Sequence, residues 1–177
     1  MLNDTPKCPA CYICPVHPRV AELIEKLHLM PHPEGGYYRE IFRSAHMVTP
    51  DNERSQRSAL TNIYFLLPEG AISRWHRVQS DEVWHFYEGA PLDLLELDSS
   101  LEKLTRHRLG SLADEGHVPV ITIKAGNWQA ARSVSGYTLV GCTVGPGFDF
   151  ADFAMLSEDW ELAAKVSSLL PEEDDFL

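Results

Sequence analysis

The 177-residue sequence contains no apolar run that approaches the roughly 20 residues of a membrane-spanning helix. The segment Met1–Ala10 also lacks the apolar core of a secretory signal, so we expect a cytoplasmic protein with no membrane partner. Positive charge is scarce, because 15 lysines and arginines face 26 acidic residues and leave a net charge of −11. A chain this acidic repels a phosphate backbone, which excludes nucleic acid as an expected partner.

The sequence also lacks internal repeats and low-complexity tracts, which excludes solenoids and propellers. Its apolar content of 44% is that of a globular protein, and its length suits one domain with its own core. We therefore expect a single domain over residues 16–170. A Cys- and Pro-rich irregular arm is predicted at 1–15, and an acidic tail at 171–177.

Cysteine is rare outside that arm, in which Cys8, Cys11 and Cys14 lie together. Such spacing can bind zinc or an iron–sulfur cluster, but a CxxC pair normally needs a second pair of ligands from distant sequence. The chain has no second pair of this kind, so we interpret the three residues as part of an irregular arm. The fourth cysteine, Cys142, lies inside an apolar run and is predicted to be a small buried residue.

Apolar residues first follow a helical period and then an alternating one. From Val20 to Leu27 they recur at three- and four-residue spacing, which predicts a helix that ends before Pro31. Beyond it, short segments with a period of two are separated by glycine-containing turns, the pattern of an all-β sandwich or barrel. The predicted strands are 37–43, 58–67, 72–78, 82–87, 92–97, 104–109, 118–123, 128–134 and 137–144.

A second helix is predicted near the C-terminus. Ser157 is a suitable N-cap, because its hydroxyl can accept a hydrogen bond from a free backbone N–H of the first turn. The apolar face of this helix is expected to comprise Trp160, Ala163, Val166 and Leu169 or Leu170. Beyond it, the acidic run 172–175 is interpreted as a solvated end.

The densest cluster of reactive side chains lies in residues 70–89. His76 ends one predicted strand and Glu82 begins the next, and a short hairpin between them would bring both side chains to one face. Strand alternation then places Trp84 and Phe86 on the same face as Glu82. An apolar wall with one carboxylate is typical of a small-molecule pocket, so we predict a pocket centred on His76 and Glu82.

The same residues resemble the first motif of the cupins, which reads Gly, five residues, His-x-His, three or four residues, Glu, six residues, Gly. The matching positions in this chain are Gly70, His76, Glu82 and Gly89. Val78 replaces the second histidine. The segment 124–129 is similar to the second cupin motif, with Gln129 in place of its histidine.

Four blocks of sequence resemble the fifth cupin subfamily, a group known as a domain of unknown function. They cover residues 33–40, 61–67, 80–89 and 145–153, and the resemblance extends over nearly the whole chain outside the Cys-rich arm. It implies an all-β fold, the cupin double-stranded β-helix or jelly-roll barrel, here with an N-terminal and a C-terminal helix. It also implies a homodimer with a cavity between the sheets, but it implies no particular reaction.

The resemblance bears on metal binding, because a metal-dependent cupin offers three histidines and a glutamate. Here Val78 cannot bind a metal, and Gln129 would be a weak, neutral ligand beside His76 and Glu82. We therefore expect no cofactor. The alternative is a metal-dependent dioxygenase or decarboxylase with a divalent metal on His76, Glu82 and Gln129.

The main functional hypothesis is a metal-independent isomerase or epimerase that acts on a small polar or anionic metabolite. His76 would be the general base, Glu82 its orienting carboxylate, and Tyr38 or Tyr64 the acid. The residues expected to contact the ligand are Thr61, Ser73, Arg74, Trp84 and Gln129. The remaining alternative is a binding or sensor module without chemistry.

An aromatic block late in the predicted barrel, Phe148–Phe153, carries apolar residues on both alternating faces. A strand of this kind is expected to be covered on both sides, and we interpret it as lying between the barrel and a partner subunit. The remaining histidines without a partner pattern are expected to be surface or core residues. They are His28, His32, His46, His107 and His117.

Overall fold

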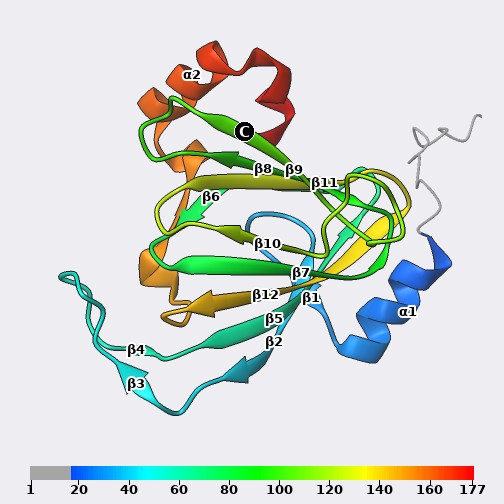
Figure 1. The fold of residues 1–177 in the computed structure, drawn as a ribbon, viewed down its shortest axis with the longest axis horizontal. Helices are drawn as coiled ribbons and strands as arrows, with labels where there is room; N and C mark the ends of the chain where they lie inside the picture. Colours follow the sequence, from blue (N-terminus) through cyan, green and yellow to red (C-terminus); the bar gives the residue numbers. More distant parts are fainter. Residues whose placement is uncertain (1–16) are drawn as a thin grey trace, which may run out of the picture.

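Two antiparallel sheets face each other and form the body of the molecule (Figure 1). The computed structural model describes residues 17–177, so the arm with Cys8, Cys11 and Cys14 lies outside the described residues. The first sheet has the order β1 (Met30–Pro31), β2 (Tyr37–Arg43), β5 (Thr61–Pro68), β12 (Tyr137–Gly145), β7 (Asp81–Gly89) and β10 (Val120–Ile123). The second has the order β13 (Phe153–Met155), β6 (Ile72–Val78), β11 (Trp128–Ser133), β8 (Leu92–Leu97) and β9 (Leu104–Leu109).

Consecutive strands often fall in opposite sheets, and this topology is that of a jelly-roll barrel, so the predicted all-β fold is confirmed. β6 belongs to the second sheet and β7 to the first, so the chain crosses between the sheets just after Val78. The predicted hairpin between these two strands is therefore wrong. His76 and Glu82 are nevertheless both buried, because alternation along β7 turns Glu82 and Trp84 inward as predicted.

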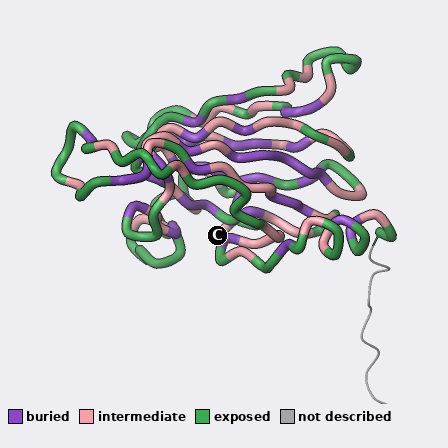
Figure 2. The backbone as a smooth tube through the Cα atoms, turned by 90° about the horizontal axis from the view of Figure 1, so that it is seen from below, coloured by how far each residue is buried: buried purple, intermediate pink, exposed green. Residues whose placement is uncertain are grey.

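Three apolar clusters stabilise this arrangement, and Figure 2 shows their buried residues along the middle of the strands. The cluster between the two sheets includes Phe65, Leu67, Trp84, Leu94 and Ile123. The cluster that contains C-terminal residues includes Trp75, Trp128, Leu156, Val166 and Phe176. The cluster beneath the N-terminal helix includes Val20, Leu23, Leu66 and Leu139. Each large apolar side chain buried in this way contributes roughly 1.5–3 kcal/mol to the free energy of unfolding.

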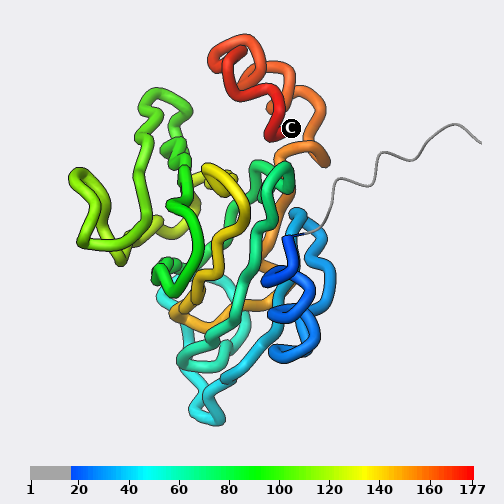
Figure 3. Tube along the Cα trace, turned by 90° about the vertical axis from the view of Figure 1, so that its right-hand side faces the viewer, coloured from blue at the N-terminus to red at the C-terminus, as the bar shows by residue number. Residues whose placement is uncertain are grey.

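The N-terminal helix α1 (Pro18–Leu27) forms as predicted and packs against the side of the barrel (Figure 3). The ring of His17 accepts a hydrogen bond from the backbone N–H of Arg19 and caps the first turn. Pro18 suits that turn because its missing N–H would have no helical partner. None of the described helices is long and apolar enough to cross a membrane.

The C-terminal helix α2 (Trp160–Leu169) begins later than predicted. Its N-cap is Asp159, whose carboxylate accepts from the backbone N–H of Leu162 at 3.0 Å, whereas Ser157 lies in the preceding 3-10 turn. Trp160 is 75% exposed, although it was expected on the apolar face, and Val166 is the buried residue of the helix. The packed side is completed by partly buried apolar residues, namely Leu162, Ala163 and Leu170.

The acidic C-terminal segment is only in part the solvated end that its composition predicted, because three of its four acidic residues are exposed and Glu173 is not. Residues Pro171–Phe176 form a 3-10 helix, η3, which lies with α2 on one end of the barrel (Figures 1 and 3). Glu173 is buried and accepts a hydrogen bond from Arg106 at 2.7 Å. Phe176 is only 1% exposed, and its ring centroid lies 6.3 Å from that of Trp75. Burial of the Phe176 ring and the bond between Glu173 and Arg106 both fasten η3 to the barrel.

The predicted strand over the block Phe148–Phe153 is wrong for most of its length. The carboxylate of Asp149 caps a short 3-10 turn, η1 (Phe150–Asp152), by accepting from the backbone N–H of Ala151. Only its last residue, Phe153, enters a strand, because β13 begins there and pairs with β6. The partner subunit expected on this block stays a prediction.

Candidate functional site

A cavity of about 300 Å³ is lined by residues of both sheets and of the η1 segment, a size that suits a small molecule. Its polar lining consists of His32, Glu34, Tyr38, Glu40, Arg43, Thr61, His76, Glu82, Cys142 and Asp149. Its apolar lining consists of Ile63, Phe65, Val78, Val144, Phe148, Phe150 and Phe153. The predicted centre of the pocket, His76 and Glu82, therefore lies on a cavity, together with residues that the sequence did not single out.

Both ring nitrogens of His76 face oxygen atoms of the protein. Nδ1 lies 2.7 Å from the backbone oxygen of Arg74, and because a carbonyl can only accept, this nitrogen carries a proton. Nε2 lies 3.2 Å from Oε2 of Glu34. At this distance the protonated imidazole and the Glu34 carboxylate form an ion pair. The carboxylate that orients His76 is thus Glu34 rather than the predicted Glu82.

Glu34 is buried, and its carboxylate lies among polar neighbours. Oε1 accepts from the hydroxyl of Ser73 at 2.7 Å, and Oε2 lies 3.3 Å from Nδ1 of His32, a nitrogen that accepts from the backbone N–H of Glu34 at 3.4 Å. Burial alone would raise the pKa of Glu34, but the charge of His76 and the hydrogen bond with His32 outweigh it and lower the pKa. Glu34 is therefore a stable carboxylate inside the barrel.

The loop that carries Glu34 is attached to β6 by its backbone. The N–H of Arg74 donates to the oxygen of Glu34 at 2.9 Å, and the Arg74 guanidinium donates to the oxygen of Pro33. Gly35 has a φ of 119°, and a Cβ there would lie 2.0 Å from the oxygen of Ile72. Arg74, expected to contact the ligand, thus anchors this loop. The only sequence signal for Glu34 was its place before a Gly-Gly turn, in a block that resembles the subfamily.

Glu82 has a different environment from Glu34. Its Oε2 accepts from Nε2 of Gln129, and Oε1 of Gln129 accepts in turn from the indole N–H of Trp84 at 3.0 Å. Because an indole N–H can only donate, it fixes the orientation of the Gln129 amide. Glu82 forms no ion pair with any described cation. Trp84 and Gln129 therefore support Glu82 from behind and are not among the residues that line the cavity.

The pKa of Glu82 is shifted in the opposite direction to that of Glu34. Burial raises it, and the negative charge of Glu34 raises it further, while the charge of His76 and the hydrogen bond from Gln129 act against the shift. The thiol of Cys142, which lines the same cavity, also has a raised pKa because it is buried beside these carboxylates. Two carboxyl groups whose environments separate their pKa values are the usual mark of an acid–base site.

The predicted tyrosines lie on different sides of the first sheet. Tyr38 lines the cavity, with its ring centroid 4.6 Å from that of His32. Tyr64 packs with the apolar cluster beneath α1 and does not line the cavity. Thr61 lines the cavity, but its hydroxyl also accepts from the backbone N–H of Phe148 at 2.9 Å. Of the two candidate acids, the structure brings only Tyr38 to His76 and Glu82.

The aromatic wall of the cavity is held by a buried ion-pair network. Arg57 donates to both oxygens of Asp152, at 2.9 and 2.8 Å, and Arg54 donates to Oδ2 at 3.0 Å. Asp152 ends η1, and the ring centroids of Phe148 and Phe150 in this segment lie 5.0 Å apart. The arginines come from the excursion that contains β3 (Met47–Val48) and β4 (Arg57–Ser58), so a distant segment positions this wall.

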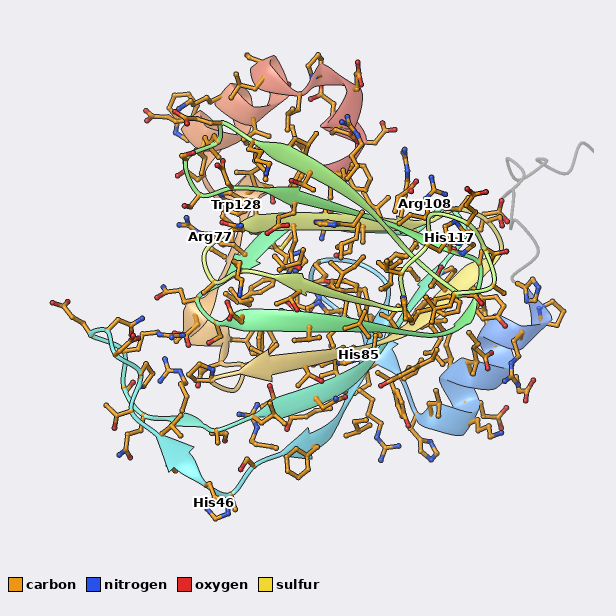
Figure 4. The ribbon with its side chains drawn as sticks, in the orientation of Figure 1. His46, Arg77, His85, Arg108, His117 and Trp128 are labelled. Atoms are coloured by element: carbon orange, nitrogen blue, oxygen red, sulfur yellow. The ribbon has the colours of Figure 1, made fainter. Side chains whose placement is uncertain are left out.

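Five histidines were predicted to be surface or core residues without a role in the site. His32 differs from that prediction, because it lines the cavity and contacts Glu34. Figure 4 places His46 at the start of the β3–β4 excursion, just before β3, and His117 in the connection between β9 and β10. His107 lies 2.9 Å from Glu96, outside the cavity. The sequence did not predict that His32 lines the cavity, because nothing in its local sequence indicates a contact with Glu34.

The donor atoms around the cavity do not fit the metal that the barrel binds in other cupins. Val78 offers no donor, and Oε1 of Gln129, the atom that would bind a metal, accepts from Trp84. Nδ1 of His76 carries a proton donated to the oxygen of Arg74, and Nε2 faces the carboxylate of Glu34. Within residues 17–177, no group of three or more His, Cys, Asp and Glu side chains is arranged to hold a metal ion.

Comparison with known proteins agrees with this architecture. The profile of a family described as "Cupin superfamily (DUF985)" matches residues 21–156. A hypothetical protein from Leishmania major is 34% identical over 87% of this chain and 93% of that chain, with a TM-score of 0.75. The crystal structure of a Shewanella oneidensis protein is 33% identical over 87% of this chain and 91% of that chain, with a TM-score of 0.73.

More distant structures share the fold alone. Oxalate decarboxylase from Bacillus subtilis is 14% identical over 80% of this chain and 34% of that chain, with a TM-score of 0.54. No curated protein matches the sequence. The comparisons therefore bear on the architecture, and the chemistry has to be argued from the cavity.

Proposed function

The chain belongs to the cupin superfamily, in the family described as DUF985, and from this premise we propose that it binds a small molecule in the barrel cavity and moves a proton on it without a metal. The reaction class is isomerisation or epimerisation next to a carbonyl group. The observation that carries the proposal is the pair of buried carboxyl groups, Glu34 and Glu82, whose pKa values are shifted in opposite directions at one cavity.

Glu82 is the proton-transferring group in this proposal. A carboxyl with a raised pKa is a stronger base when ionised and exchanges its proton closer to neutral pH than an ordinary glutamate. As a carboxylate it takes a proton from a carbon next to a carbonyl, and as the acid it returns that proton to the product. His76 is less suited to this role because its Nδ1 is bonded to a backbone carbonyl and its Nε2 faces the carboxylate of Glu34.

The Glu34–His76 pair has an electrostatic role. Removal of a proton next to a carbonyl places negative charge on the carbonyl oxygen, and His76 in its protonated form beside Glu34 stabilises that charge inside a low-dielectric barrel. Glu34 keeps that charge in place, and Ser73 and His32 hold Glu34. Tyr38, which also lines the cavity, is a neutral hydroxyl donor available to the substrate.

Proton exchange in D2O tests this function directly. The wild-type protein is incubated with a panel of small aldehydes, ketones and 2-oxo acids, aminoketones included, and deuterium incorporation next to the carbonyl is followed by NMR. Exchange is expected to fall at least about a hundredfold in Glu82→Gln, because the amide cannot accept the proton. Glu115→Gln, which makes the same change at an exposed position, serves as the matched control.

Equal exchange rates in Glu82→Gln and wild type would contradict the role of Glu82. Exchange that depends on an added divalent metal and disappears with a chelator would favour the metal-dependent alternative. Binding of a panel compound without any exchange would instead identify a binding module.

A further inference from the structure

The cations that line the cavity are already paired with protein groups. The Arg43 guanidinium donates through Nε and Nη2 to the two oxygens of Glu40, at 3.0 and 2.7 Å, and through Nη1 to the oxygen of Phe148 at 3.1 Å. Three of its five N–H groups are therefore used, and its charge is balanced by Glu40. His76 is likewise paired with Glu34. Arg43, His32 and His76, the basic side chains that line the cavity, thus each lie beside a carboxylate of the protein, which weakens their attraction for an anionic ligand.

Carboxylates, in contrast, remain in excess. Four acidic side chains line the cavity, and Glu34 and Glu40 are the ones with cationic partners. Glu82 has only neutral hydrogen-bond partners, and Asp149 accepts from a backbone N–H but forms no ion pair within residues 17–177. Since Glu82 is a buried carboxyl directed at a cavity, a cationic ligand would supply the partner that the fold does not.

The phenyl rings that line the cavity can also bind a cationic ligand. Phe148, Phe150 and Phe153 form a cluster of edge-to-face rings with centroid distances of 5.0 to 6.1 Å. Phenyl faces attract cations through the ring quadrupole, and they also pack against an apolar body. The phenyl rings thus lie on the same cavity as the two carboxylates without cationic partners.

We propose that the cavity selects a cationic small molecule, one that carries an ammonium or comparable group on a compact apolar body. The positive group lies against Glu82 and Asp149, and the apolar body lies among the phenyl rings. This class of ligand differs from the small polar or anionic metabolite expected from the sequence. The inference rests on the proposed function, because both place the ligand in this cavity, and it adds the charge of the substrate.

A set of three probes of similar size tests the charge selection without any turnover. Phenethylamine, 2-phenylethanol and phenylacetate are cationic, neutral and anionic at pH 7.5, and their dissociation constants are measured by titration of backbone amide NMR signals. We expect phenethylamine to bind at least about tenfold more tightly than 2-phenylethanol, and phenylacetate to bind most weakly. Shifted signals should belong to residues around the cavity, such as those of η1.

Two variants change the charge of the lining in defined ways. Glu82→Gln is expected to reduce the preference for phenethylamine over 2-phenylethanol severalfold. Glu40→Gln frees Arg43 and is expected to tighten the binding of phenylacetate about tenfold. Glu115→Gln, at an exposed position, is the control for a loss of charge far from the cavity and is expected to leave all three constants unchanged.

Several results would overturn the inference. Tighter binding of phenylacetate, equal binding of all three probes, or an unchanged preference in Glu82→Gln would show that the cavity does not select positive charge. If no probe binds while deuterium exchange on a neutral carbonyl compound depends on Glu82, the charge selection fails and the proposed function stands. If phenethylamine binds and no compound exchanges, the proposed function fails and the charge selection stands.

Discussion

Glu82 lowers the stability of the folded protein because its carboxyl group is buried. Its side chain is 7% exposed, and the nearest groups include another carboxylate, Glu34, so ionisation is disfavoured in the folded protein. Gln129 supports it with an amide rather than with a positive charge. An apolar or amide side chain would suit this position better in a purely structural core, which is why we assign Glu82 to function.

The stability of Glu82→Gln should therefore depend on pH in a defined direction. The folded-state pKa of Glu82 is raised above its ordinary value of 4.5, so its contribution to stability is complete below that value and is lost as pH rises through the folded pKa. Glutamine imitates the protonated acid at every pH. The variant is expected to gain stability over wild type between pH 4 and pH 8, as measured by urea denaturation. A variant that loses stability over this range would show that the fold favours the carboxylate.

At the scale of elements, the C-terminal helices differ from a free amphipathic tail because one ring at the end of η3 is buried. Phe176 lies in the apolar cluster with Trp75 and beneath the guanidinium of Arg132, at 5.3 Å from its ring centroid. Trp160, at the start of α2, lies in solvent. Of these two aromatic residues, Phe176 therefore contributes to the stability of the C-terminal region and Trp160 contributes little.

A pair of alanine substitutions separates these two aromatic residues. Phe176→Ala is expected to lower the free energy of unfolding by about 3–5 kcal/mol, because it empties a buried position. Trp160→Ala is expected to change it by less than about 0.5 kcal/mol, because the ring is exposed. Urea denaturation of the two variants and the wild type measures both values. Similar losses in the two variants would contradict the packing of η3.

At the scale of the whole molecule, segments far apart in sequence meet at the cavity. The Glu34 loop, β6 and β7 supply the acid–base groups, and η1 supplies the aromatic wall. Asp152 binds Arg54 and Arg57 of the β3–β4 excursion across almost 100 residues of sequence, with separations of 98 and 95. The excursion, although it lies outside the barrel in Figure 1, thus takes part in shaping the cavity.

Removal of the Asp152 carboxylate should lower the free energy of unfolding, and the size of this loss should depend on pH. Burial opposes ionisation of Asp152, but the hydrogen bonds and charges of Arg57 and Arg54 lower its pKa below the ordinary 3.8. Its contribution to stability is therefore present above pH 3.8 and is lost as the pH falls through the folded pKa. Asp152→Asn is expected to lose about 3 kcal/mol at pH 7 and to approach wild type in strong acid, as measured by urea denaturation.

Asp51→Asn provides the matched control for that experiment, because Asp51 is exposed on the same excursion. It should stay within about 0.5 kcal/mol of wild type. A loss in Asp152→Asn that is the same at pH 7 and in strong acid would show that the carboxylate charge is not responsible.

The sequence by itself determined the barrel, because the alternation of apolar residues along a short strand can be recognised without knowing which strands it pairs with. It also placed His76 and Glu82 at the pocket, since their spacing matches a motif that lies within one stretch of chain. Only the tertiary structure decided which carboxylate meets His76. Glu34 lies 42 positions earlier in the sequence and reaches the histidine only because a loop docks on β6. The same holds for Phe176, whose burial depends on a surface made by other strands, so no local pattern could reveal it.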